Sequence, residues 1–207
     1  MRPHRSVATA AAAGMILALL AGCATPAASA PSSGAPLGAA WPAPPEGEVI
    51  ATGTVMDVDG AVELCLGPIM ESYPPQCDGI PLSGWAWDGV EGSETSGATT
   101  WGAYAVYGTY DGETFTNTRP PIMLALFDPI AREDPTGGVP GASNDATLTA
   151  IADELPAQLG AGYLTSSPQN GYLWVSVLWD DGTWQDAVDA EYGPGVVVIS
   201  SAIWPFE

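Results

Sequence analysis

The side chains that could do chemistry in this chain are almost all carboxylates. Its 207 residues include 24 Asp and Glu and four Arg, no Lys, and a single histidine, His4, near the N-terminus. This composition excludes a Ser-His-Asp or Cys-His site, a Ser-Lys dyad, a Schiff-base lysine and a histidine metal site. It also excludes nucleic-acid binding, which needs a basic patch to neutralise phosphates.

Two carboxylates at a set separation are enough for glycoside hydrolysis, so acid-only hydrolysis stays open. Adjacent acids occur at Asp153-Glu154 and at Asp180-Asp181. Adjacent residues on a helix do not face one another, and the sequence marks neither pair as buried. The pairs are candidates by proximity alone, and we assign no catalytic residue.

Asp57-x-Asp59-Gly60 resembles the start of a calcium-binding loop. The EF-hand pattern needs a further oxygen ligand and a later glutamate, and this segment lacks both at the required spacing. A hairpin turn is the better interpretation, so we predict no metal site. We predict no cofactor either, since no glycine-rich phosphate loop of the required form occurs.

Trp85 and Trp87 alternate along the sequence, so in a strand they would share one face. Aromatic side chains on one face of a β-domain can stack on sugars, which makes these two tryptophans candidate binding residues. Aromatic pairs more often lie in a core, and that alternative stays open.

The first 22 residues have the pattern of an export signal, with a positively charged start and an apolar run over residues 7–20. This run is shorter than the roughly 20 residues needed to span hydrocarbon. Leu20-Ala21-Gly22-Cys23 then resembles the lipobox of bacterial lipoproteins. The resemblance implies that Cys23 is acylated and anchors the mature protein to the extracytoplasmic face of the cell membrane. An ordinary signal peptide with a chance cysteine is the alternative.

Residues 24–47 consist largely of Ala, Pro, Ser and Gly. This composition predicts a lipidated, disordered tether over residues 23–47, because it offers too little apolar surface to offset the entropy of ordering. Trp41 is the exception, and we interpret it as a stray aromatic rather than a residue that docks on the folded body. Beyond residue 22 only two arginines oppose the 24 acids, a formal charge of −22.

Cys65 and Cys77 remain once Cys23 is acylated, an even number in an oxidising compartment. The segment between them contains several Pro and Gly residues, which suits a bridged loop better than a helix. We predict a disulfide between these two cysteines.

Residues 48–127 predict an all-β domain of about five strands, either barrel-like or a folded sheet, with an OB-like barrel as one candidate. Asp59-Gly60 and Asp111-Gly112 each separate two β-rich segments and are typical of two-residue hairpin turns. A further extended segment covers residues 80–87, a loop covers 90–100, and an edge strand lies within 121–127.

We predict that residues 128–144 form a linker and that residues 145–207 form a second domain of α+β class. Apolar residues at helical spacing begin this domain, and Pro156 should end or kink the helix near Glu154 or Leu155. Two strands around residues 166–170, a short helix ended by Gly193-Pro194 and a last strand over residues 196–203 complete an α-β-β-α-β order.

Short motifs rich in Cys, Gly, Trp and Tyr cover roughly the first half of the mature chain. They are Cys65-Leu66-Gly67, Glu71-Ser72-Tyr73-Pro74-Pro75-Gln76-Cys77-x-Gly79, Gly84-Trp85-x-Trp87-Asp88, Trp101-Gly102 and Gly108-Thr109-Tyr110-Asp111-Gly112-x-x-Phe115-Thr116. Together they resemble an actinobacterial family of secreted or lipid-anchored proteins. The resemblance implies an envelope location and a disulfide but no reaction.

Both sides of the strands in the last domain are apolar, whereas two short helices can cover only one side. Trp174 and Trp204 fall on the uncovered side, so they are candidate interface residues. We expect this side to meet the β-rich domain, a partner protein or a second copy.

The predicted function is therefore that of a cell-envelope lipoprotein acting as a non-catalytic interaction or assembly module, with an envelope protein or a saccharide as possible partner. A binder of cell-wall saccharide or of a small ligand is the alternative, and an acid-only hydrolase is the third candidate.

Overall fold

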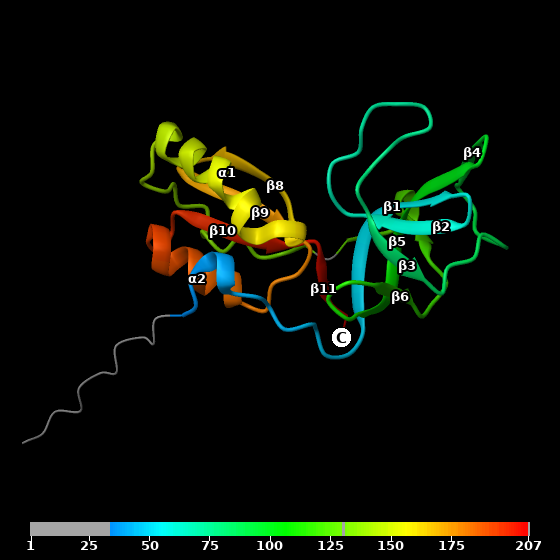
Figure 1. Cartoon of the computed structure of the whole chain (residues 1–207), viewed down its shortest axis with the longest axis horizontal. Coiled ribbons are helices and arrows are strands. Elements are labelled where there is room, and N and C mark those ends of the chain that lie inside the picture. Colours follow the sequence, from blue (N-terminus) through cyan, green and yellow to red (C-terminus); the bar gives the residue numbers. More distant parts are fainter. Residues whose placement is uncertain (1–33, 130, 207) are drawn as a thin grey trace, which may run out of the picture. The chain divides into compact units, whose positions relative to one another are not determined.

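A computed structural model describes residues 34–129 and 131–206 (Figure 1). The export signal, the acylation site Cys23 and the first part of the predicted tether lie outside these residues. No helix in the described part of the chain is long and apolar enough to cross a membrane.

The first sheet closes into a five-stranded barrel, as predicted, and the folded-sheet alternative is wrong. The strands run in the order β1 (Val49–Val58), β2 (Ala61–Cys65), β3 (Ile80–Ser83), β6 (Phe115–Asn117) and β5 (Thr99–Tyr110). Pairing of β1 with β5, from Val49 opposite Gly108 to Val58 opposite Thr99, closes the barrel. Only β3 and β6 pair in parallel; the other barrel neighbours are antiparallel.

Inward-facing apolar side chains fill the barrel. This core consists of Val49, Ala51, Val55, Leu64, Leu82, Tyr104, Val106, Tyr110, Phe115 and Ile203. Ile203 belongs to β11 (Ile203–Pro205), which pairs with β1. The last described residues of the chain therefore complete the first sheet.

The two Asp-Gly turns differ from one another. Asp59 and Gly60 both have positive φ, 53° and 89°, so the predicted two-residue hairpin turn is confirmed. At the second turn only Gly112 has positive φ, and the two-residue prediction is wrong. There the Asp111 carboxylate accepts hydrogen bonds from the backbone N–H groups of Glu113 (3.0 Å) and Thr114 (2.8 Å), which closes a longer turn.

Two other predicted segments are corrected. The extended segment over residues 80–87 ends at Ser83, because Gly84 adopts a φ of 71° and turns the chain. The predicted loop over residues 90–100 contains β4 (Glu94–Ser96), which pairs with the start of β5. The edge strand expected within residues 121–127 is β7 (Ile122–Met123), followed by the 3₁₀ turn η2 (Leu124–Leu126).

The second sheet has three strands and is covered by two helices. Along the chain the elements are α1 (Asp145–Leu159), η3 (Gly160–Gly162), β8 (Tyr163–Gln169), β9 (Tyr172–Val177), α2 (Thr183–Tyr192) and β10 (Val197–Ser201). The sheet order is β10-β9-β8. The loop expected over residues 166–170 is wrong, because β8 continues to Gln169 and the chain reverses at Asn170-Gly171, both with positive φ.

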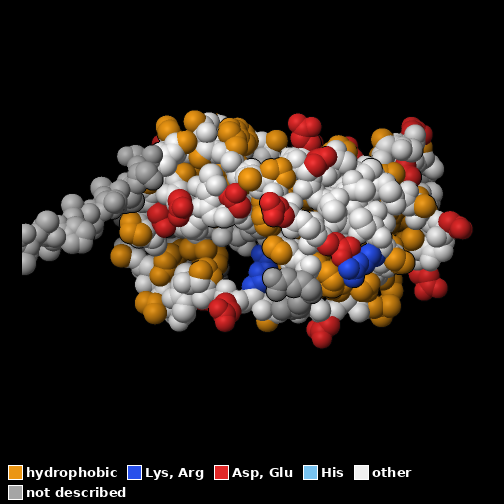
Figure 2. All heavy atoms as spheres, turned by 90° about the horizontal axis from the view of Figure 1, so that it is seen from below, with side chains coloured by type: hydrophobic (Ala, Val, Ile, Leu, Met, Phe, Trp, Pro, Cys, Tyr) orange, Lys and Arg blue, Asp and Glu red, His pale blue; other side chains and the backbone are white. Residues whose placement is uncertain are grey.

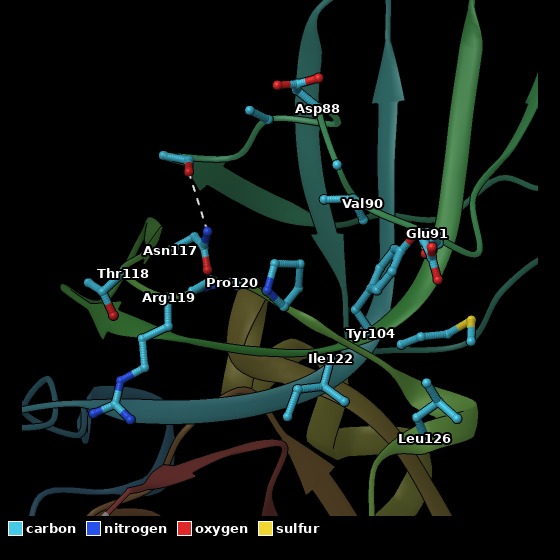
Figure 3. Close-up of a pocket in the computed structure, with 15 residues that line it drawn as sticks. Asp88, Val90, Glu91, Tyr104, Asn117, Thr118, Arg119, Pro120, Ile122 and Leu126 are labelled. Atoms are coloured by element: carbon cyan, nitrogen blue, oxygen red, sulfur yellow. Dashed lines mark hydrogen bonds between the residues drawn. The ribbon is translucent and has the colours of Figure 1, made fainter.

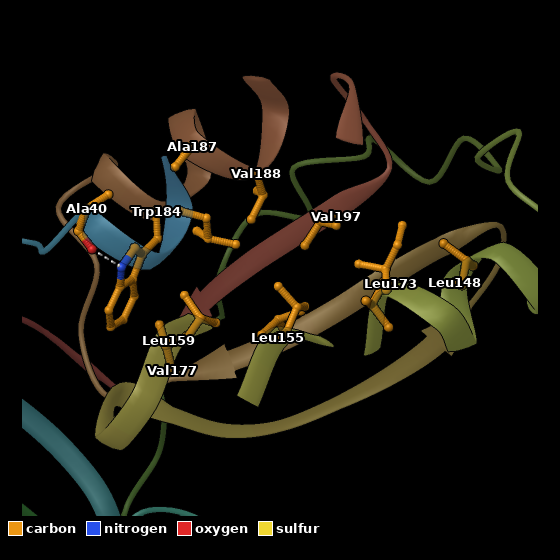
Figure 4. Close-up of a cluster of buried hydrophobic side chains, with 13 residues drawn as sticks. Ala40, Leu148, Leu155, Leu159, Leu173, Val177, Trp184, Ala187, Val188 and Val197 are labelled. Atoms are coloured by element: carbon orange, nitrogen blue, oxygen red, sulfur yellow. Dashed lines mark hydrogen bonds between the residues drawn. The ribbon is translucent and has the colours of Figure 1, made fainter. Parts of the chain in front are cut away.

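Both helices pack on the same face of this sheet (Figure 4). The shared core contains Leu148, Ile151, Leu155, Leu159, Leu173, Val175, Val177, Trp184, Ala187, Val188 and Val197. The predicted α+β class therefore describes this half of the protein.

Helix α1 does not end near Leu155, which was one of the two outcomes predicted for Pro156. Asn144 caps its start by accepting a hydrogen bond from the backbone N–H of Thr147 (3.0 Å). Pro156 lies inside the helix, which continues to Leu159. An interior proline costs about 3 kcal/mol. Leu155 and Leu159 are both fully buried, and burying each side chain contributes roughly 1.5–3 kcal/mol, so their burial offsets the cost.

The disordered tether predicted over residues 23–47 is wrong for residues 34–47. The turn η1 (Leu37–Ala39) places Leu37, 1% exposed, in the core under both helices, with Ala40 beside it. Trp41 contacts the edge of Trp184, with ring centroids 6.2 Å apart, although 62% of Trp41 stays exposed. We name residues 34–47 the N-terminal arm. Composition underestimated its order because buried Leu37 and backbone hydrogen bonds of Ala40 and Ala43 dock it on the body.

The described part of the predicted linker also packs on the protein. The backbone N–H of Gly141 donates to the carbonyl oxygen of Asn170 (2.8 Å), and the Tyr172 hydroxyl donates to that of Val139 (3.0 Å). These contacts hold the segment against the β8–β9 turn.

Candidate functional site

Asp180 and Asp181, one of the two candidate pairs of adjacent acids, serve as structural acceptors. The Asp180 carboxylate accepts hydrogen bonds from the backbone N–H groups of Trp184 (2.9 Å) and Gln185 (3.2 Å) at the start of α2. Burial raises the pKa of Asp180, and these hydrogen bonds oppose the rise. Asp180 therefore satisfies N–H groups that the first turn of a helix leaves unpaired.

Asp181 ties the N-terminal arm to the same helix start. Its carboxylate accepts from the backbone N–H groups of Ala43 (3.0 Å) and Thr183 (3.1 Å), and a side-chain hydrogen bond from Thr183 lowers its pKa. Asp153 and Glu154, the other candidate pair, are exposed on α1. Neither pair has the buried, facing carboxyl groups that acid–base hydrolysis requires.

Asp57 is engaged within the β1–β2 hairpin. It accepts from the backbone N–H of Gly60 (2.8 Å) and from the indole Nε1 of Trp87 (2.9 Å). Among residues 34–129 and 131–206, no group of three or more His, Cys, Asp or Glu is placed to hold a metal ion.

Trp85 and Trp87 lie on the same side of the barrel, although they follow the end of β3 rather than belonging to it. Their rings meet edge to face, with centroids 5.2 Å apart, and both pack against Tyr104 at 5.3 and 6.2 Å. All three side chains are buried or half-buried and contact the barrel core. The two tryptophans therefore pack against the core, which favours the core alternative for this pair.

Beside this aromatic cluster lies a cavity of about 740 Å³, which we name the barrel groove (Figure 3). Its walls are the segments that follow the parallel strands β3 and β6, residues 84–91 and 117–126. The hydroxyl of Tyr104 donates to the carbonyl oxygen of Glu91 (3.0 Å) and fixes the floor. Leu126 is 74% exposed at the rim.

The barrel groove combines apolar walls with acidic and amide groups. Asp88, Glu91 and Asn117 line it. The amide nitrogen of Asn117 donates weakly to the carbonyl oxygen of Gly84 (3.4 Å), whereas its buried Oδ1 has no hydrogen-bond partner in the structure. A buried acceptor without a partner is costly, so a ligand donor at this position would be stabilising.

Arg119, also in the groove wall, is neutralised by another residue. It forms a two-point ion pair with Glu48, whose pKa is lowered chiefly by a hydrogen bond from Thr118. The guanidinium carbon lies 5.6 Å from the Tyr107 ring centroid and 4.9 Å from that of Phe206. The field in the groove therefore comes mainly from Asp88 and Glu91.

The predicted disulfide joins Cys65 and Cys77, with Cα atoms 6.1 Å apart. The residues between them form a loop that projects from the barrel between β2 and β3 (Figure 1). We name residues 66–76 the bridged loop. Ile69, Met70 and Tyr73 are 38%, 59% and 73% exposed on it, so large apolar side chains face solvent on a covalently closed segment.

The bridged loop has internal structure. The backbone N–H of Met70 donates to the carbonyl oxygen of Gln76 (2.8 Å), and the hydroxyl of Ser72 donates to that of Pro74 (2.9 Å). The Tyr73 ring meets the edge of Trp101 with centroids 5.5 Å apart. Together with the disulfide, these contacts reduce the conformational freedom of the loop in the unbound protein.

The structure brings together the two predicted interface residues, Trp174 and Trp204. Both line a groove of about 630 Å³ with Arg132, whose guanidinium carbon lies 4.2 Å from the Trp204 ring centroid. Arg132 also donates to the carbonyl oxygen of Ser201 (2.7 Å). The predicted linker thus supplies part of what covers this side, and both tryptophans are half-buried.

Several surface residues escaped the sequence reasoning. The exposed apolar side chains of the bridged loop and the unpaired Oδ1 of Asn117 were not predicted from the sequence. Exposure of a loop side chain depends on where the loop leaves the barrel, which periodicity does not indicate.

No family model, curated protein or solved structure matches this chain. The geometry described above therefore carries the functional argument.

Proposed function

We propose that this chain is an extracytoplasmic lipoprotein, acylated at Cys23, whose folded body is a non-catalytic interaction module. The observation that carries the proposal is the bridged loop, which exposes Ile69, Met70 and Tyr73 on a segment closed by a disulfide. An aromatic side chain among apolar neighbours is typical of the residues that dominate binding energy at protein interfaces. Because the loop is already ordered, binding costs less conformational entropy.

The anchor limits where the partner can be. The 14 residues from Cys23 to the docked Leu37 span at most about 50 Å when fully extended. A body held this close to the membrane meets other membrane-bound proteins at a raised effective concentration. The partner we propose is therefore a protein of the same membrane surface.

The negative charge of the chain indicates a second property of this partner. The mature chain carries a formal charge of −22, and the ion pair with Glu48 neutralises one of its two arginines. Acidic side chains are scattered over the face shown in Figure 2, whereas basic side chains occupy little of it. A partner with basic residues around an apolar patch would be attracted by the field and would bury the loop side chains. Like-charged proteins would be repelled.

The anchor and the loop can be tested separately. Intact-mass analysis of the membrane fraction should show an acylated Cys23 as the N-terminus, and Cys23→Ser should release the protein. An unmodified mature protein in the medium would contradict the anchor.

For the loop, a photo-cross-linking residue at position 73 should give one discrete adduct in the native envelope. The matched control is position 139, where Val139 is 63% exposed on another segment. Met70→Asp should abolish the adduct at position 73. Equal adducts from both positions, or an adduct unaffected by Met70→Asp, would contradict the proposal.

A second candidate function is binding of a cell-wall saccharide or another small ligand in the barrel groove. Its volume of about 740 Å³ lies in the range of ligand sites. Titration with soluble peptidoglycan fragments should then shift the resonances of Tyr104 and of the Asn117 side-chain amide, which line the groove, and Asp88→Asn should weaken binding. Unchanged resonances would remove this candidate.

A further inference from the structure

A separate aromatic pocket lies on the outside of the barrel, where β11 and β5 flank β1. Its volume is about 360 Å³. The residues that line it are Ile50, Tyr107, Phe127, Asp128, Trp204, Pro205 and Phe206. Four of these seven are aromatic.

The strand register explains why the pocket forms. Ile50 of β1 pairs with Trp204 of β11 on one side and with Tyr107 of β5 on the other. Side chains of directly paired residues lie on the same face, and neighbouring strands are about 4.8 Å apart. The two aromatic residues therefore stand roughly 10 Å apart as walls, with Ile50, 3% exposed, between them as the floor.

The rings of this pocket already attract cations. Arg119 lies over Tyr107 and Phe206, and Arg132 lies over Trp204. These are the only two basic residues after the leader, and in the described chain their ring contacts are all with pocket residues. Neither arginine lines the pocket itself: Arg119 lines the barrel groove and Arg132 the groove beside Trp174.

Asp128 supplies the pocket's own charge. It is the only charged side chain that lines the pocket, and it is exposed at the rim. The positive charge of Arg119 is balanced by Glu48, so it opposes a bound cation little. The formal charge of −22 adds a long-range attraction for positive ligands.

We propose that this aromatic pocket binds a quaternary ammonium group, with the methyl groups against Tyr107, Trp204 and Phe206 and the charge near Asp128. A primary ammonium or a metal ion needs several hydrogen-bond or coordination partners, whereas Asp128 is the single carboxylate among the described residues that line the pocket. A quaternary ammonium donates no hydrogen bond and is attracted by aromatic faces, so an aromatic pocket with one carboxylate satisfies it. This site is independent of the bridged loop and of the barrel groove.

The test compares a cation with its uncharged counterpart of the same shape. Purified mature protein is titrated with choline chloride and with 3,3-dimethyl-1-butanol, at matched ionic strength, while the Trp204 indole resonance is followed by NMR. Choline should bind about tenfold more tightly than the alcohol, as expected for a desolvated cation on aromatic rings. Equal affinity would show a merely apolar pocket, and no binding of choline at millimolar concentrations would overturn the proposal.

Variants distinguish choline binding in this pocket from nonspecific binding elsewhere on the protein. Asp128→Asn changes an exposed side chain, so it should leave the fold intact while weakening choline binding several-fold. Asp88→Asn in the barrel groove is the matched control and should change nothing. Trp204→Leu should abolish binding, with circular dichroism confirming that the variant is folded. Choline affinity unchanged by Asp128→Asn and Trp204→Leu would also overturn the proposal.

Discussion

The indole Nε1 of Trp184 donates a hydrogen bond to the backbone carbonyl oxygen of Ala40 across 144 residues of sequence, at 2.8 Å and in a buried environment (Figure 4). Trp179 makes a similar contact, from its Nε1 to the carbonyl oxygen of Ala43 (2.8 Å). The N-terminal arm is thus part of the folded body, and any lipid anchor at Cys23 is joined to it by a short segment.

Because the N-terminal arm is docked, substitution of Leu37 should strongly lower the stability of the protein. Leu37→Ala should lower the free energy of unfolding by about 2–5 kcal/mol, because it leaves a cavity in the core under both helices. Urea denaturation of the mature protein measures this. The neighbouring Pro36→Ala, at an exposed position, is the control and should stay close to wild type. Equal stabilities of the two variants would mean that the arm is not docked in solution.

Removing the disulfide should weaken both the protein and its bridged loop. The double variant Cys65→Ser/Cys77→Ser should lose about 3 kcal/mol of stability on the chain-entropy model. Non-reducing peptide mapping of the wild type should recover both cysteines in one linked species. If both cysteines of the exported, folded protein react freely with an alkylating agent, the disulfide is absent.

We expect ionisation of Tyr110 to lower the stability of the folded protein at high pH. Burial, with smaller contributions from Asp111 and Glu113, raises its pKa to about 12. The unfolded chain ionises this phenol near its ordinary value of 10 while the folded protein keeps it neutral, so stability is lost as the pH rises from 10 to 12.

Tyr110→Phe should therefore flatten the dependence of unfolding free energy on pH in this window, measured by urea denaturation. Tyr73→Phe, at a position 73% exposed, should keep the wild-type slope. A wild-type slope in Tyr110→Phe would assign the alkaline loss to other groups.

We predict that Gln185 prevents association through the exposed edge of the second sheet. Its side-chain amide accepts from the backbone N–H of Ile199 (2.9 Å) and donates to the carbonyl oxygen of Val197 (3.1 Å), on the edge strand β10. Gln185→Ala should cost about 1–3 kcal/mol, and it should promote edge-to-edge association. Analytical ultracentrifugation should show concentration-dependent oligomers.

The control for this edge is Gln158→Ala, which removes only a contact with the Tyr192 hydroxyl. It should remain monomeric under the same conditions. Oligomers of both variants, or of neither, would show that Gln185 does not protect the edge.

Local features of the sequence were sufficient for much of the fold. Asp59-Gly60 between two β-rich segments predicted the β1–β2 hairpin, because few other residue pairs accept positive φ at both positions. The spacing of Leu148, Ile151, Leu155 and Leu159 predicted a helix whose buried face has those residues. Cysteine number and the intervening prolines predicted the Cys65–Cys77 bridge.

Only the tertiary structure decided where the first and last described segments of the chain lie and which surfaces they form. Ile50 lies between Tyr107 and Trp204 because β1 pairs with β5 and β11 at the same residue, and such long-range register leaves no local signal. Likewise, Leu37 is buried because two helices far along the chain leave room for it. Composition by itself predicted disorder there. A short stretch of sequence shows how few apolar side chains it has, but it does not show that distant parts of the chain bury them.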